Sequence, residues 1–122
     1  MSFWAGKRVL VTGGAGLIGA CLVAKLIERG ASLRVVDDLS RGSLDNLGVL
    51  REKIDFRQLD LLNPDACRGL LDSVDFCFHL AARIGGIGYF HKYPATCLRD
   101  NSRMCINLWE EARETLTKMV CV

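Results

Sequence analysis

The sequence has a small net charge, few aromatic residues and no long apolar run, and each shortage excludes a class of protein. Its 122 residues carry a formal net charge of +2 with the two signs interspersed, which argues against nucleic acid or an anionic membrane as partner. Aromatic residues make up 7% of the chain and form no basic–aromatic stripe of the kind that single-stranded nucleic acid requires. No segment approaches the length of a membrane span, and the first residues lack the apolar core of a signal peptide. We therefore expect one globular domain over residues 1–122, with no nucleic-acid or membrane partner.

Metal-binding and disulfide patterns are missing too, although the chain has 6 cysteines. No Cys-x-x-Cys pair occurs, and most of the cysteines stand among apolar neighbours. This distribution favours reduced thiols in the core of a cytoplasmic protein, with metal binding or disulfide formation as the alternative. The cysteines are Cys21, Cys67, Cys77, Cys97, Cys105 and Cys121.

The most informative feature that is present is a glycine-rich stretch, Thr12–Gly19, which follows a short apolar run and opens an apolar helical segment. In this spacing Gly13 permits a tight turn, Gly16 lets the backbone approach a pyrophosphate, and Gly19 lets the helix pack closely on the strand. Free N–H groups at the start of the helix, Leu17–Ile18, then face the phosphates together with the positive end of the helix dipole. The stretch predicts dinucleotide binding, against the alternative of a purely structural turn.

Apolar and polar runs alternate along the rest of the chain. Strands are predicted at residues 7–12, 33–37, 54–59, 75–82 and 118–122, and helices at residues 16–29, 44–52, from 64 onwards and 94–115. Asn63 and Pro64 suit the N-cap and the first position of the third helix. Strands that alternate with helices predict an α/β fold: a Rossmann-type doubly wound parallel sheet of strand order 3-2-1-4-5, truncated after strand five.

Two of the predicted helices have extensive apolar surfaces. The helix at residues 16–29 is apolar almost all round, which is typical of a helix that is buried against a sheet. The long helix at residues 94–115 places Leu98, Ile106 and Trp109 on one face, together with smaller residues.

Asp37 ends the second predicted strand, 18 positions after Gly19. A carboxylate there can accept hydrogen bonds from both ribose hydroxyls of an adenosine, and it would repel a 2′-phosphate, so it favours NAD over NADP. Asp38 doubles the negative charge, and Arg41 stands close enough in sequence to offset part of it. The alternative is a solvated carboxylate at a strand end.

The ends of the third and fourth predicted strands offer further cofactor contacts. Asp60 can accept a hydrogen bond from the adenine amino group while Leu61 packs on the base, although an aspartate after a strand also forms turns. Leu80, Ala81 and Ala82 end the fourth strand with small side chains, as is needed where a cofactor lies against backbone. A plain buried strand end would look similar.

Four more features near these strand ends have two interpretations each. Arg83 either reaches a pyrophosphate or substrate phosphate, or is an exposed arginine that binds nothing. Asn101 either hydrogen-bonds the loop that carries the nicotinamide or is a polar residue on a solvent face. The loop Gly85–Gly88 either wraps the nicotinamide or is only a mobile loop. His79, inside an apolar strand, is interpreted as a satisfied core histidine rather than a general base.

Together these residues resemble the extended short-chain dehydrogenase/reductase superfamily, and within it the NAD-dependent epimerase/dehydratase family that acts on nucleotide sugars. The motifs are Thr12-Gly13-x-x-Gly16-x-x-Gly19, Val36-Asp37-Asp38-Leu39-Ser40, Leu59-Asp60-Leu61 and His79-Leu80-Ala81-Ala82. The resemblance implies NAD as the cofactor and adds Leu39 to its contacts. The segment Ala82–Ile87, followed by Tyr93-Pro94 and Asp100-Asn101, is most similar to GDP-fucose synthase and GDP-mannose epimerase relatives.

In this family a Tyr-x-x-x-Lys pair and a nucleotide-sugar domain follow strand five, and the tyrosine is the acid/base. The sequence has no such pair, because the fourth residue after Tyr89 is Tyr93 and the fourth after Tyr93 is Cys97. The resemblance therefore implies the cofactor-binding part of an epimerase, dehydratase or reductase. Such a part is inactive alone and meets a nucleotide sugar only in the complete enzyme. A non-catalytic NAD-binding sensor or subunit is the alternative.

The last predicted strand, Lys118–Val122, is apolar apart from Lys118 and is expected at an edge of the sheet. Unpaired N–H and C=O groups at such an edge are a template for pairing with another chain. We therefore expect self-association, through this edge or, less favoured, through the long helix that bears Trp109.

Overall fold

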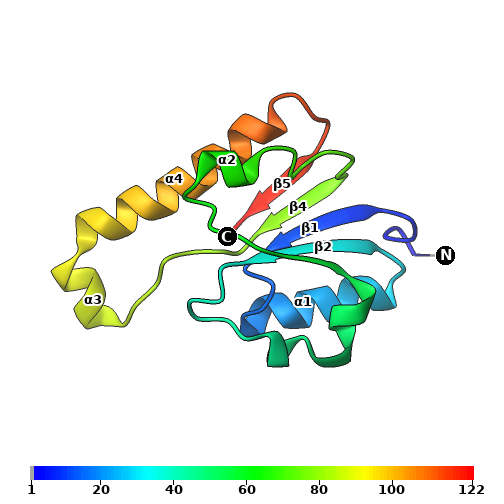
Figure 1. The fold of residues 1–122 in the computed structure, drawn as a ribbon, viewed down its shortest axis with the longest axis horizontal. Helices are drawn as coiled ribbons and strands as arrows, with labels where there is room; N and C mark the ends of the chain where they lie inside the picture. The colour runs from blue at the N-terminus through cyan, green and yellow to red at the C-terminus, as the bar shows by residue number, and fades with distance from the viewer. Residues whose placement is uncertain (1) are drawn as a thin grey trace.

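The computed structural model describes residues 2–122 and contains a single parallel sheet (Figure 1). Its strands are β1 (Arg8–Thr12), β2 (Ser32–Asp37), β3 (Asp55–Gln58), β4 (Phe76–His79) and β5 (Lys118–Cys121). They lie in the order β3-β2-β1-β4-β5, and each neighbouring pair is parallel. The predicted Rossmann-type doubly wound sheet is therefore confirmed, with the reversal of strand order between β1 and β4.

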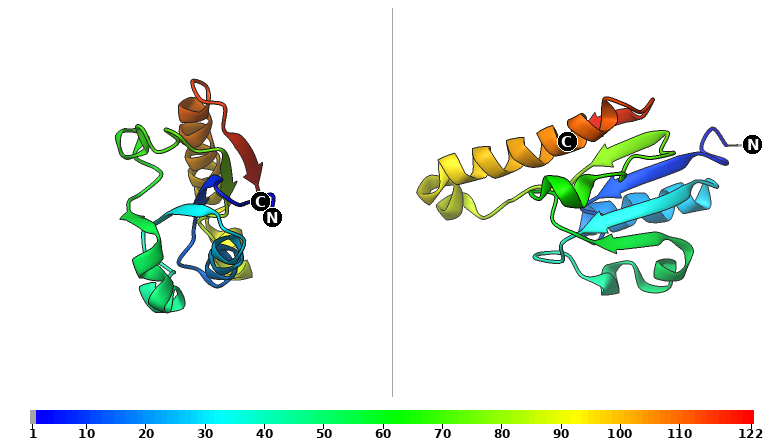
Figure 2. Two further views of the ribbon diagram at one scale, coloured as in Figure 1. Left: turned by 90° about the vertical axis from the view of Figure 1, so that its right-hand side faces the viewer. Right: turned by 45° about the horizontal axis from the view of Figure 1, so that its top comes forward.

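Helices cover both faces of this sheet (Figures 1 and 2). The helices are α1 (Leu17–Glu28), α2 (Pro64–Cys67), α3 (Ile87–Lys92) and α4 (Pro94–Ala112). α1 lies on one face and α2 and α4 on the other, whereas α3 lies beyond the sheet at the start of α4 (Figure 1). Successive side chains of a strand point to opposite faces. Val9 and Val11 accordingly pack with Val23 of α1, whereas Leu10 packs with Leu108 of α4. Because both faces of β1 are buried, its central residues Val9–Val11 are all apolar.

α1 packs against the sheet as predicted, but only one side of this largely apolar helix is buried. Gly19, Val23 and Leu26 are buried on the side that faces the sheet. Leu17 and Ile18, in the first turn, are 78% and 79% exposed. A single layer of sheet covers only one side of the helix, so apolar residues at its start face outward, beside the glycine-rich stretch.

The fourth strand is shorter than predicted. β4 ends at His79, which pairs with Thr12, and Leu80–Ala82 continue as a loop. The reason is that β1 turns away at Gly13 and leaves the next residues without a strand partner on that side. The loop is followed by α3, a helix that the glycine-rich sequence at residues 84–88 did not suggest.

The boundaries of the other helices differ less from the predicted ones. Residues 44–52 form two short 3₁₀ helices, Leu44–Asn46 and Gly48–Lys53, instead of one weak helix. Asn63 is the predicted N-cap of α2, and its side chain accepts a hydrogen bond from the Asp65 N–H at 3.0 Å. None of the helices within residues 2–122 is both long and apolar enough to span a bilayer.

The apolar face predicted for the long helix is on the solvent side of α4. Leu98, Ile106 and Trp109 are 72%, 57% and 58% exposed. The side that faces the core carries Met104 and Leu108 instead. Among the residues that the structure describes, none covers this apolar outer face of α4.

Candidate cofactor site

The strand order reverses between β1 and β4, whose carboxyl ends lie side by side. The glycine-rich stretch follows β1 at this point. Gly13 has φ +69°, and a Cβ there would lie 2.9 Å from the Ala81 nitrogen. A Cβ at Gly19 would overlap the Gly13 carbonyl oxygen. A Cβ at Gly16 would meet only that same carbonyl oxygen, at 3.4 Å. Gly13 thus makes the turn and Gly19 the close packing, whereas the space in front of Gly16 is open.

The amino end of α1 presents unused hydrogen-bond donors to this open space. Within residues 2–122, the N–H groups of Leu17, Ile18 and Gly19 donate to no protein acceptor. The helix has 12 residues, so its dipole places partial positive charge at the same end. Free donors, positive potential and open space are the requirements of a pyrophosphate site, so the residues present fit a dinucleotide.

Asp37 ends β2 beside this turn and is only 9% exposed. Its carboxylate accepts hydrogen bonds from the Ala15 N–H at 3.0 Å and from the Leu39 N–H at 2.9 Å. These bonds fix the orientation of the carboxylate. Because each carboxylate oxygen can accept about two hydrogen bonds, Asp37 still has capacity for ribose hydroxyls.

Asp38 is oriented differently from its neighbour. It is exposed, and its carboxylate accepts hydrogen bonds from the N–H and the hydroxyl of Ser40 at 2.9 and 2.7 Å. Arg41 does not pair with it and instead donates to the Ile84 carbonyl at 3.0 Å. That bond links the loop after β2 to the loop after β4.

The two candidates at the end of β3 have different environments. Asp60 is exposed, and its carboxylate accepts a hydrogen bond from the Leu62 N–H at 2.9 Å, as in a turn. Leu61 is 3% exposed and packs in the core with Leu108. Its side chain therefore presents almost no surface to an adenine in this arrangement, whereas the Asp60 side chain remains accessible.

Sequence reasoning did not assign a role to the hydroxyl of Thr12, which joins the ends of β1 and β4. Its Oγ1 accepts hydrogen bonds from the N–H groups of Leu80 and Ala81, both at 3.1 Å, and lies 2.7 Å from Nδ1 of His79. With two bonds accepted, the hydroxyl donates its own hydrogen to Nδ1 of His79. The sequence feature that could have indicated this role is the position of Thr12 at the end of a strand, next to Gly13.

His79 is the satisfied core histidine that the sequence suggested. It is 5% exposed, and burial lowers its pKa. Because Nδ1 accepts from Thr12, the ring is neutral with its hydrogen on Nε2. Thr12 and His79 together fix the start of the loop that carries Leu80, Ala81 and Ala82.

Helix α4 holds the continuation of this loop. The side chain of Asn101 accepts a hydrogen bond from the Arg83 N–H at 2.6 Å and donates to the Arg83 carbonyl at 3.2 Å. The Arg83 side chain pairs with the buried carboxylate of Asp100 at 2.9 Å, and Arg99 lies 2.8 Å from the other oxygen. Asn101 thus contacts the predicted loop, and Arg83 is engaged within the protein.

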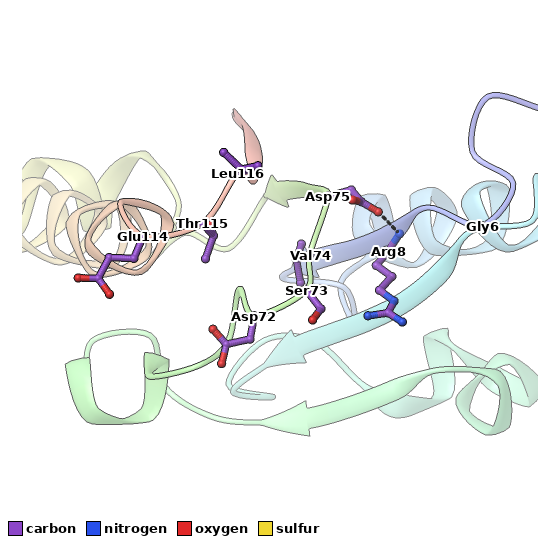
Figure 3. A pocket seen from close by; sticks show the side chains of 9 residues that line it. All are labelled: Gly6, Arg8, Asp72, Ser73, Val74, Asp75, Glu114, Thr115 and Leu116. Carbon is purple, nitrogen blue, oxygen red and sulfur yellow. Dashed lines mark hydrogen bonds between the residues drawn. The ribbon is translucent and has the colours of Figure 1, made fainter.

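A separate hollow of about 540 Å³ lies at the opposite end of the sheet (Figure 3). It is lined by residues around the start of β1 and the loop before β4, among them Arg8, Ser73 and Asp75. The Asp75 carboxylate accepts a hydrogen bond from the Arg8 N–H at 2.8 Å. Open α/β sheets bind their ligands at the carboxyl ends of the strands. We therefore place the candidate site at the glycine-rich stretch and not in this hollow.

The sheet, the glycine turn and the free helix terminus define a Rossmann-type fold with the features of a dinucleotide site. The model of the NAD dependent epimerase/dehydratase family matches residues 9–122, and the chain belongs to that family.

Known proteins of similar sequence and structure support the family assignment. UDP-glucuronic acid decarboxylase 1 of Arabidopsis thaliana is 34% identical over 101 residues, which are 83% of this chain and 22% of that protein. The Bordetella bronchiseptica enzyme WbmF in complex with NAD+ matches with a TM-score of 0.85 and 28% identity, over 98% of this chain and 37% of that one. UDP-glucose 4-epimerase of Thermotoga maritima with UDP-glucose matches with a TM-score of 0.82 and 30% identity, over 93% and 37% of the two chains.

This chain therefore spans well under half the length of each of these proteins. Two of them are named for UDP-linked sugars, so the finer likeness to GDP-fucose synthase and GDP-mannose epimerase is not confirmed.

Proposed function

We propose that residues 1–122 bind NAD at the carboxyl edge of the sheet and form the cofactor-binding part of an enzyme that acts on a nucleotide sugar. The observation that carries the proposal is the pairing of the open, donor-rich turn at Gly16 with the fixed carboxylate of Asp37. The free N–H groups of Leu17–Gly19 bind the pyrophosphate, and Asp37 accepts the ribose hydroxyls. The nucleotide-sugar context is supported by the enzyme names of the relatives.

The remaining predicted contacts surround that centre. Leu39 and Asp38 follow Asp37 in the chain, and Asp60 is the proposed acceptor for the adenine amino group, which its exposed carboxylate supports. Leu80–Ala82 line the other side of the turn, and Asn101 supports the loop beyond them through Arg83. When bound, the nicotinamide ring supplies hydride transfer, and these residues supply binding and orientation.

The choice of NAD over NADP depends on Asp37. Its two hydrogen bonds to backbone N–H groups keep the negative charge in place, so it cannot swing away from a 2′-phosphate. A ligand at a hundred times its dissociation constant stabilises a protein by roughly 2.7 kcal/mol, which thermal unfolding detects. We expect NAD to raise the melting temperature more than NADP does.

Three variants make this test specific. Gly16→Val fills the open space and should abolish the shift, because the pyrophosphate loses its place. Asp37→Asn should weaken NAD binding and reduce the discrimination more than Asp38→Asn does, because the Asp38 carboxylate is exposed. Equal shifts from NAD and NADP in the unaltered chain would refute the specificity, and no shift from either would refute the site.

We also propose that this chain does not turn over a nucleotide sugar alone, because it contains no Tyr-x-x-x-Lys pair. Incubation with NAD and UDP- or GDP-linked sugars should yield neither reduced cofactor nor a new sugar. Turnover by the purified chain, free of contaminants, would contradict this. The alternative of a non-catalytic sensor receives no support from the family match or from the structural neighbours.

Self-association of this chain through β5 is a further part of the proposal. The N–H groups of Lys118 and Val122 donate to the carbonyls of Asp75, just before β4, and of His79 in β4. The alternate N–H groups, at Met119 and Cys121, therefore face the open edge of the sheet. A second copy can pair with those donors. Sedimentation velocity at micromolar concentration under reducing conditions should show a dimer.

Variants distinguish this edge from the apolar outer face of α4. Cys121→Pro removes an outward donor and should weaken an edge-paired dimer, whereas Trp109→Ala should leave it intact. The reverse result would assign the contact to α4, and a monomeric unaltered chain would contradict self-association.

A further inference from the structure

We propose that Cys105 and Cys121 form a redox-active thiol pair, which a peroxide converts to an intramolecular disulfide between α4 and β5. The two Sγ atoms lie 3.9 Å apart, although the residues belong to different elements. Both side chains are accessible: Cys121 is exposed and Cys105 is partly exposed. This modification does not depend on dinucleotide binding.

The position of the pair permits the bond to form. A disulfide needs its sulfur atoms about 2.0 Å apart, so the present separation must shorten by about 2 Å. Within residues 2–122, β5 is the edge strand and pairs only with β4, while α4 lies beside it (Figures 1 and 2). An edge strand that is held on one side can move by this amount more easily than a central strand.

The other cysteines lack this combination of accessibility and a partner. Cys67 and Cys77 are buried, and burial raises their thiol pKa values to about 11 and about 12. Cys97 is also buried, and Cys21 is exposed on α1, on the opposite face of the sheet. Within residues 2–122 no group of three metal-ligating side chains exists, so a metal does not explain the pair.

The reaction balances with one peroxide for each disulfide. The Cys121 thiolate attacks a peroxide oxygen, the O–O bond breaks, and a sulfenic acid and one water result. The Cys105 sulfur then attacks the sulfenic sulfur, the S–S bond forms, the S–O bond breaks and a second water leaves. The two sulfurs supply the two electrons that reduce the peroxide, and the thiol protons end in water.

The rate should be modest. Burial and the adjacent Cys105 thiol raise the pKa of Cys121, although the Trp109 side chain acts in the opposite direction. A small thiolate fraction slows attack on a peroxide. The pair is therefore suited to slow oxidation rather than to rapid dithiol exchange.

The disulfide would lie close to the contact that holds the loop after β4. Cys105 follows Asn101 by four residues on α4, so the two lie on the same side of the helix. A covalent tie between Cys105 and β5 would fix the segment of α4 from which Asn101 binds the Arg83 backbone. Oxidation should therefore raise the melting temperature of the chain.

The test is intact-mass analysis of the purified chain after hydrogen peroxide, with free thiols alkylated before unfolding. We expect a species that has lost two hydrogens, and a digest that links the peptides of Cys105 and Cys121. Cys105→Ser and Cys121→Ser should each abolish it, whereas Cys21→Ser, a matched exposed thiol, should retain it. The melting temperature should rise on oxidation only in chains that retain both Cys105 and Cys121, and a reductant should reverse the rise.

Other outcomes would overturn the proposal. Oxygen adducts without loss of hydrogen would mean that the two sulfurs do not meet. A disulfide that persists in Cys105→Ser or in Cys121→Ser would assign the bond to other cysteines. A disulfide-linked dimer on a non-reducing gel, in place of the intramolecular bond, would mean that the exposed thiols react between chains.

Discussion

Two glycine-rich segments flank the point where the strand order reverses, and their glycines are there for different reasons. In the segment after β1, a Cβ at Gly13 or Gly19 would collide with backbone atoms. In the segment after β4, a Cβ at Gly86 or Gly88 would meet nothing within 4 Å. Backbone atoms close on the glycines of the first segment, whereas in the second Gly85 faces the Tyr89 side chain and Gly86 and Gly88 face open space.

The two segments are also held differently. The turn after β1 is held by its own backbone and by the Asp37 carboxylate, which binds the Ala15 N–H. The loop after β4 depends on α4, whose Asn101 binds the Arg83 backbone on both sides. The comparison teaches that glycine content alone does not identify a phosphate-binding turn, because only in the first segment do backbone atoms close on the glycines.

The largest expected effect comes from adding one methyl group to each segment. Gly19→Ala places a Cβ on the Gly13 carbonyl oxygen, and we expect a loss of roughly 3 kcal/mol in the free energy of unfolding. This exceeds the helix-propensity gain of about 1 kcal/mol. Gly88→Ala, in α3 and in open space, should instead stabilise by roughly 0.5–1 kcal/mol.

Urea unfolding of both variants measures the difference. Similar losses in both would remove the distinction between the segments. A neutral Gly19→Ala would show that the turn can relax to accept a side chain there.

A smaller effect is expected when the external support of the second segment is removed. Asn101→Ala deletes two hydrogen bonds to Arg83 at a partly exposed site, so the loss should be about 1 kcal/mol. Amide exchange should accelerate in residues 82–86 and remain unchanged in the turn at residues 13–16. Ser102→Ala, at the exposed next position of α4, is the control. Faster exchange in both segments would mean that they are not held independently.

Most of the fold follows from local patterns in the sequence. The apolar runs give the strands, and their alternation with helices gives the parallel order, because both depend on residues close in the chain. The role of Gly13 could be predicted for the same reason, since the constraint comes from a turn directly after β1.

The features that could not be predicted from the sequence depend on contacts between distant segments. Leu61 was expected beside a base, but packing against α4 buries it in the core. The sequence of α4 predicts an apolar face, but it does not say whether another segment covers that face. In the structure the apolar residues are exposed. The end of β4 at His79 is set by where β1 turns away, which the sequence of β4 itself does not contain.

The smallest expected effect concerns His79, which joins the two segments through the Thr12 hydroxyl. Burial lowers its pKa below the unfolded value of 6.5, so below pH 6.5 the unfolded chain binds a proton that the folded chain does not. The free energy of unfolding should therefore fall as the pH drops below that value, until the folded pKa is reached. His79→Asn keeps an acceptor for the Thr12 hydroxyl but does not titrate, so urea unfolding at pH 7.5 and 5.5 should show a smaller pH dependence. His91→Asn, at an exposed position on α3, should keep the dependence of the unaltered chain. An equal pH dependence in His79→Asn and the unaltered chain would show that this buried ring does not couple protonation to folding.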